Sequence, residues 1–102
     1  CGPCMRMLPD LEMLKDLYDG RADVAYIDIG KNPEVMQYIP VRVTPTIAVY
    51  EKDGKPFEPG DEPSFRFILY SDRNTGEHMV TVTEGALPLE SLRTLAEELI
   101  VD

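Results

Sequence analysis

The chain contains two cysteines, Cys1 and Cys4, which lie three positions apart at its start. At this spacing in the first turn of a helix, Cβ atoms lie about 5–6 Å apart, slightly more than the roughly 3.5–4.5 Å that a disulfide prefers. A bond between them would form under strain and would be easily reduced. The spacing therefore indicates a disulfide that is made and broken during a reaction, and it disfavours a purely structural one.

A helix start would also activate the first of the two sulfurs. The free N–H groups and the positive end of the helix dipole stabilise a thiolate there. We therefore expect Cys1 to be the nucleophile and Cys4 to resolve the mixed disulfide that forms. Gly2 allows the backbone to turn tightly beside the sulfur, and Pro3 costs no helical hydrogen bond at this position. Both residues suit a redox-active loop.

A zinc site is the competing interpretation of the cysteine pair. Such a site needs two further ligands, and the chain offers only His78 and carboxylates. We therefore expect no metal, and thiol exchange itself requires no bound cofactor. His78 stands next to Glu77 in a predicted hairpin loop, where it is expected to be a solvated turn residue without a role.

The charge balance excludes two classes of partner. Asp and Glu number 19 against 10 Lys and Arg, a net charge of -9, and no cluster of basic residues is present. Nucleic acids and anionic membrane surfaces are therefore not expected as partners. The longest apolar runs have four residues, far fewer than the roughly twenty of a membrane helix, so no membrane span is expected in this segment. The length suits one domain over residues 1–102.

The first half of the chain predicts two helices and a strand. Apolar residues recur at three- and four-residue steps over residues 5–18, which indicates an amphipathic helix kinked at Pro9. Residues 23–29 form an apolar, β-branched run, as in a strand that is buried on both faces of a parallel sheet. Asn32 is expected to cap a short helix that begins at Pro33.

The second half predicts a strand, a hairpin and a final helix. In chain order, we expect a strand over residues 46–50, a turn at 52–55, hairpin strands over 65–70 and 79–83, and a helix from Pro88 that packs on the sheet. The loop over residues 56–63 is rich in proline and acidic residues, and it is expected to lie on the surface with no core of its own. This order of elements indicates a mixed α/β fold.

Several of these segments resemble one family. The motif Cys1-Gly2-Pro3-Cys4, followed by a helix with Pro9 five residues after Cys4, resembles the active-site helix of thioredoxins. The resemblance continues through residues 24–29, Asn32-Pro33, residues 41–46 and Gly85-Ala86-Leu87. It implies a thioredoxin-like fold, in which helices flank a central mixed β-sheet.

Thr44-Pro45 is the second specific point of resemblance. An X-Pro bond is cis only about one time in twenty in folded proteins, so the residues alone favour a trans bond. The resemblance instead implies a cis bond, with Pro45 against the Cys1 sulfur. It also implies that the backbone of Thr44 pairs with an extended segment of the substrate, as an added β-ladder rung would.

The chain departs from the family pattern at two places. The helix over residues 5–18 should be the crossover of a right-handed βαβ unit, yet no residue precedes Cys1 to form the first strand. We therefore expect a thioredoxin-like domain that is N-terminally incomplete. Residues 55–84 carry an extra strand and a long loop before the last helix, an insertion where the family needs only a tight hairpin.

The expected function is that of a thiol–disulfide oxidoreductase that reduces protein disulfides. Gly2-Pro3 resembles the dipeptide of reducing thioredoxins, which implies an external reductase or other thiol donor as a partner and a cytoplasmic location. Two alternatives stay open. One is an extracytoplasmic disulfide exchange protein, and the other is a non-catalytic binding module whose cysteines are inert or share a metal between chains.

Overall fold

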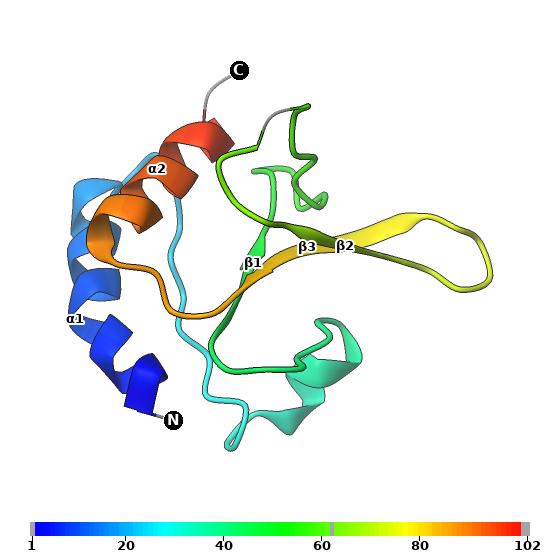
Figure 1. The fold of residues 1–102 in the computed structure, drawn as a ribbon, viewed down its shortest axis with the longest axis horizontal. Helices are drawn as coiled ribbons and strands as arrows, with labels where there is room; N and C mark the ends of the chain where they lie inside the picture. Colours follow the sequence, from blue (N-terminus) through cyan, green and yellow to red (C-terminus); the bar gives the residue numbers. More distant parts are fainter. Residues whose placement is uncertain (1, 62, 101–102) are drawn as a thin grey trace.

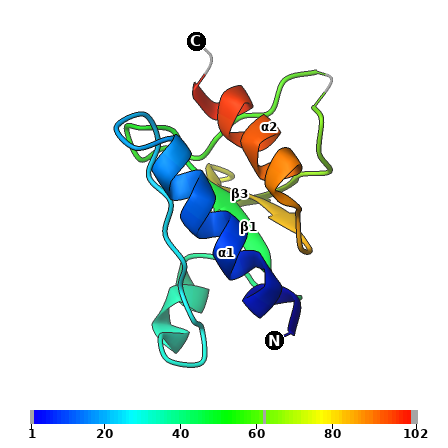
Figure 2. The ribbon, with the colours of Figure 1, turned by 90° about the vertical axis from the view of Figure 1, so that its left-hand side faces the viewer.

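The computed structural model describes residues 2–61 and 63–100. Two helices, α1 (Gly2–Leu17) and α2 (Leu89–Ile100), lie side by side on one side of a three-stranded sheet (Figures 1 and 2). A short 3-10 helix, η1 (Pro33–Gln37), lies across the sheet from α2. The predicted mixed α/β class, with helices packed on a sheet, is confirmed.

The sheet consists of β1 (Thr46–Val49), β2 (Ile68–Ser71) and β3 (His78–Glu84) in the order β1-β3-β2. Both pairings are antiparallel, so the expected mixed sheet is an antiparallel one in the part of the chain that the structure describes. Because β3 is the central strand, its middle is almost fully enclosed: Val80 and Val82 are 1% and 0% exposed. β2 is the predicted extra strand, and with β3 it extends from the body as an arm (Figure 1).

Residues 22–28 contradict the prediction of a buried strand. They have no regular secondary structure, and the side chains of Tyr26 and Ile27 are 48% and 47% exposed. A strand is stable only when a neighbour satisfies its backbone N–H and C=O groups. Within residues 2–61 and 63–100, no strand pairs with this segment. An apolar, β-branched run expresses a preference for extended backbone, but it cannot supply its own partner.

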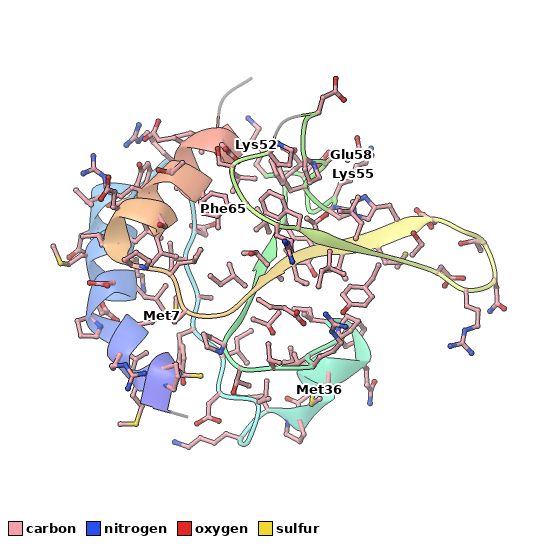
Figure 3. The ribbon with its side chains drawn as sticks, in the orientation of Figure 1. Met7, Met36, Lys52, Lys55, Glu58 and Phe65 are labelled. Carbon is pink, nitrogen blue, oxygen red and sulfur yellow. The ribbon has the colours of Figure 1, made fainter. Side chains whose placement is uncertain are left out.

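Helix α1 begins at the predicted cysteine loop and contains Pro9. Its buried face is formed by Cys4, Met7 and Leu14, and Met7 points toward the interior (Figure 3). The predicted apolar stripe included Met5, which is instead 67% exposed. A helix buries only the face that meets another element. In α1 this face contains Met7 and not Met5.

The core consists of two adjoining groups of side chains. The first joins α1 to α2 and contains Met7, Leu14, Tyr18, Leu92 and Ala96. The second joins the sheet to α2 and contains Val49, Phe57 and Leu95. The hydroxyl of Tyr18 also donates a hydrogen bond to Oε2 of Glu97 at 2.6 Å, which ties the end of α1 to α2. The predicted packing of the last helix is therefore confirmed.

The sequence predicts that the loop after the 52–55 turn lies entirely on the surface. The structure shows instead that one of its residues enters the core. Phe57 is only 8% exposed, and its ring meets that of Phe67 edge-on, with centroids 5.7 Å apart. Its backbone N–H donates to the carbonyl oxygen of Val49 at 3.0 Å. The composition of the loop averages over many exposed residues, and so it conceals a single aromatic side chain that enters the core.

His78 was also predicted incorrectly. It begins β3, and its Nε2 lies 2.8 Å from Oγ1 of Thr81. That hydroxyl donates to the carbonyl oxygen of Phe57. Because a hydroxyl has one proton to donate, Nε2 must be the donor in its contact with Thr81. His78 therefore belongs to a hydrogen-bonded connection between β3 and the 56–63 loop.

The predicted turn at residues 52–55 is confirmed, whereas the predicted helix cap at Asn32 is wrong. The 52–55 turn is confirmed, because Gly54 has a φ of +88° and donates its N–H to Glu51 O at 2.9 Å. The short helix at Pro33 is confirmed as η1, but Asn32 makes no side-chain capping bond. Its amide instead donates to the carbonyl oxygen of Asp28 at 3.1 Å, which closes the preceding turn.

Candidate functional site

The candidate redox loop opens helix α1. Gly2, Pro3 and Cys4 belong to the first turn of this helix, where backbone N–H groups have no intrahelical partner. Cys4 is 8% exposed and is disulfide-bonded. Cys1, the predicted nucleophile, lies outside the described residues. The predicted position of the loop at a helix N-terminus is thus observed for the three residues that can be seen.

An arginine lies beside this loop. Nη1 of Arg6 is 3.4 Å from the position that a Cβ atom on Gly2 would occupy. A Cβ atom at position 2 would therefore be in ordinary van der Waals contact with the guanidinium group. Arg6 was not among the predicted site residues, although its i+4 spacing from Gly2 on one helix face is a signal that could have suggested it.

The Thr44–Pro45 peptide bond is cis, as the family resemblance implied. Backbone contacts hold this loop against the end of β3: Gly85 donates its N–H to Pro45 O at 2.9 Å, and Thr46 pairs with Glu84 in the sheet. Thr44 itself is exposed. Its backbone makes no hydrogen bond with another residue in the ranges 2–61 and 63–100, so its N–H and C=O groups are open to an added strand.

A bidentate ion pair flanks the same loop. Arg42 donates from Nε to Oε2 of Glu84 at 3.0 Å and from Nη2 to Oε1 at 2.8 Å. These hydrogen bonds hold the pKa of Glu84 below its usual value against the opposing effect of burial, and they raise the pKa of Arg42. The pair joins the loop before Pro45 to the end of β3.

Sequence reasoning missed the Arg42–Glu84 pair. Its members are 42 positions apart, and only the pairing of β1 with β3 brings them together. Both stand next to segments that carried the family resemblance, Thr44-Pro45 and Gly85-Ala86. That proximity is the signal that could have identified them, but it required the register of the sheet.

The two loops lie at one end of the molecule. The start of α1 and the start of β1 both lie in the lower half of Figures 1 and 2. Because Gly2-Pro3-Cys4 opens α1 and Thr44-Pro45 directly precedes β1, the fold brings the two loops to the same half of the molecule, although about 40 positions separate them. Among the described residues, no group of three or more His, Cys, Asp or Glu side chains could hold a metal ion. No helix within the described ranges is long and apolar enough to cross a membrane.

Comparison with known proteins links this end of the molecule to one family. The family model for thioredoxin matches residues 1–65, which include both loops. The chain is 41% identical over 58 residues to the thioredoxins of Staphylococcus haemolyticus and Staphylococcus epidermidis, and 40% identical to that of Staphylococcus aureus. These alignments cover 57% of this chain and 55% of each relative. The chain thus spans about half the length of the curated relatives that it matches.

Proposed function

This chain belongs to the thioredoxin family, and on that premise we propose that it catalyses thiol–disulfide exchange through Cys1 and Cys4. The observation that carries the proposal is the family match over residues 1–65, which include Cys1 and Cys4. Cys4 is in the disulfide state, the oxidised form that such a reaction produces. The unpaired N–H groups of the first turn of α1 favour a thiolate at this loop.

The reaction conserves atoms and electrons. The Cys1 thiolate attacks one sulfur of a substrate disulfide, which forms a mixed disulfide and releases the other substrate sulfur as a thiolate that takes up a proton. The Cys4 thiol then loses its proton and attacks the Cys1 sulfur. This step closes the Cys1–Cys4 bond and releases the second substrate thiol. Two electrons pass from the chain to the substrate, and no bound cofactor takes part.

We further propose that the substrates are protein disulfides and that Thr44 binds them. Thr44 is exposed, and its backbone has no hydrogen-bond partner in the described ranges, so it can pair with an extended substrate segment. An external reductase or another thiol donor returns the two electrons to Cys1–Cys4. This direction of flow suits a reducing compartment such as the cytoplasm.

The test is a redox titration of the intact chain against dithiothreitol and glutathione series, with thiol content read by mass. We expect a single two-electron transition near about -270 mV, the potential typical of thioredoxins. A transition near about -120 mV, as in strong protein oxidants, would favour the extracytoplasmic exchange protein instead. If the Cys1–Cys4 disulfide did not form and open reversibly, the proposal would fail, and the non-catalytic binding module would replace it.

A further inference from the structure

We propose that Arg42 is a specificity residue, which recognises an acidic side chain in the substrate segment that carries the disulfide. The inference rests on the proposed function and adds the chemical character of the substrate.

Glu84 occupies only one edge of the Arg42 guanidinium. A guanidinium has five N–H donors, and the carboxylate accepts from Nε and from one N–H of Nη2. Both N–H groups of Nη1 and the second one of Nη2 form no hydrogen bond with any side chain or carbonyl in the described part of the chain. These groups form the other edge of the fork, which has the spacing to bind a second carboxylate bidentately.

The exposure of the two partners shows which charge faces a ligand. The side chain of Arg42 is 64% exposed, whereas that of Glu84 is 20% exposed. A partner that approaches this end of the molecule therefore meets the guanidinium first. Glu84 fixes the orientation of the fork, so less conformational freedom is lost when a second carboxylate binds.

Arg42 is also close enough to Thr44 to contact a bound segment. The two residues are two positions apart in the loop before β1, so their Cα atoms lie at most about 7 Å apart. A segment that pairs with the Thr44 backbone therefore passes the Arg42 guanidinium within one to three residues of its own pairing position. Glu84 pairs with Thr46 in the sheet and accepts hydrogen bonds from Arg42, so it holds Arg42 next to the cis-proline loop.

The net negative charge of the chain opposes the proposed preference for an acidic substrate residue, so such a preference could not come from the net charge. A charge of -9 repels acidic ligands at long range. At about 0.15 M salt, charges farther apart than about 8 Å are largely screened, whereas a direct contact is not. A preference for an acidic residue at this ionic strength would therefore report a local contact, because the overall field acts in the opposite direction.

The test uses disulfide peptides in which Glu or Gln occupies each of the positions near one cysteine in turn. With the reduced 102-residue chain at about 0.15 M salt, we expect Glu to raise kcat/KM about fivefold over Gln at one position or at two adjacent ones. Arg42→Gln should bring this ratio to about one. Arg42→Lys keeps the charge but loses the fork, so it should retain only part of the preference.

The matched control is Arg73→Gln, which removes the same charge from the exposed tip of the hairpin. It should keep both the activity and the Glu preference of the unmodified chain. Because the ratio between two peptides is read, a general loss of activity in Arg42→Gln does not mimic the expected result. If Arg42 only held the cis-proline loop in place, its loss would lower kcat/KM equally for both peptides and leave the ratio unchanged.

Neutral bis(2-hydroxyethyl) disulfide separates the two proposals. If the chain reduces this compound but shows no Glu preference at any position, the role of Arg42 is wrong and the proposed function stands. The role of Arg42 is equally wrong if the preference survives in Arg42→Gln or if Lys is preferred over Glu. If the chain reduces neither the compound nor the peptides, the proposed function itself is wrong.

Discussion

The segment from α1 to the cis-proline loop and the segment from β3 to α2 differ in what they contribute. Residues 2–45 carry the candidate redox loop and Thr44-Pro45 but form no strand, and no strand in the described ranges pairs with residues 22–28. Residues 78–100 lie beyond the match to the family model, yet they contain the central strand and much of the buried core. The candidate site residues are thus concentrated in one segment and the packing in the other.

The contacts between the two segments show how one depends on the other. Pro45 is held by the N–H of Gly85, Arg42 by the carboxylate of Glu84, and Tyr18 by that of Glu97. Each contact joins a residue of the first segment to one of the second. The position of the candidate site therefore depends on residues that carry no chemistry themselves, and this division can be tested by substitutions on each side.

The largest effect should come from Cys1, which directly precedes the first segment in the sequence. Cys1→Ser should lower turnover of a disulfide substrate by at least about a thousandfold, because a serine hydroxyl is not ionised at neutral pH and is a far weaker nucleophile. Steady-state kinetics with a disulfide peptide would measure this loss. Cys4→Ser should behave differently and accumulate a mixed disulfide visible by mass. Equal residual activity in both variants would contradict the assigned roles.

The second-largest effect is expected in the second segment, where a substitution should lower the free energy of unfolding. Leu92 is 2% exposed in the group that joins α1 to α2. Leu92→Ala should lower the free energy of unfolding by about 2–5 kcal/mol, because it removes buried methyl groups and leaves a cavity. Denaturant titration would measure it. Leu69→Ala provides the control: the side chain is 51% exposed, so a change of no more than about 0.5 kcal/mol is expected.

A smaller loss is expected at the hydrogen-bonded connection from β3 to the 56–63 loop. Thr81→Val should cost about 1–3 kcal/mol, since it keeps the shape but leaves the Phe57 carbonyl and the His78 N–H without their partner. Thr83→Val is the comparison, because that hydroxyl is not hydrogen-bonded to any residue in the described ranges. Equal losses in the two variants, measured by denaturant titration, would show that the connection contributes nothing.

The smallest effect concerns the Arg42–Glu84 pair, which joins the two segments, and the way its contribution to stability depends on pH. The pKa of Glu84 is lowered in the folded chain by the Arg42 hydrogen bonds. The resulting stability is present above the ordinary value near 4.5 and is lost as pH falls through the lowered folded value. Glu84→Gln should therefore be less stable than the unmodified chain near neutral pH, and the difference should shrink in acid.

Unfolding midpoints between about pH 7 and pH 3 would measure this difference. Arg42→Gln should remove the same pH dependence, because it removes the donors that lower the pKa of Glu84. A difference that grows as the pH falls would contradict the assigned cause, since a lowered pKa can only favour the folded state on the alkaline side.

Sequence reasoning succeeded where contacts are local. The periodicity of residues 5–18 predicted α1, Pro88 and the leucines after it predicted α2, and Gly54 predicted its turn. Such features arise between residues a few positions apart, so the sequence carries them directly. The cysteine spacing and the resemblance at Thr44-Pro45 likewise indicated the thioredoxin family and the cis bond before the fold was known.

Predictions failed where a distant partner decides the outcome. Residues 22–28 have the composition of a strand, but no neighbour in the described part of the chain pairs with them. Phe57 stands in a proline-rich loop, yet it is buried because Val49 and Leu95 lie next to it in space. The sequence places no partner near His78, but in the folded chain it is hydrogen-bonded to Thr81, which in turn donates to the carbonyl oxygen of Phe57.

The amino-acid sequence by itself thus determined the helices, the turn and the resemblance to the family, and it indicated which groups are candidates for the chemistry. The tertiary structure alone decided which segments pair, which side chains are buried and how Arg42 meets Glu84, 42 positions away. The physical reason is the range of the interactions. Helical periodicity and turn conformation depend on neighbours within a few residues, whereas strand pairing, burial and ion pairing depend on chain segments that only folding brings together.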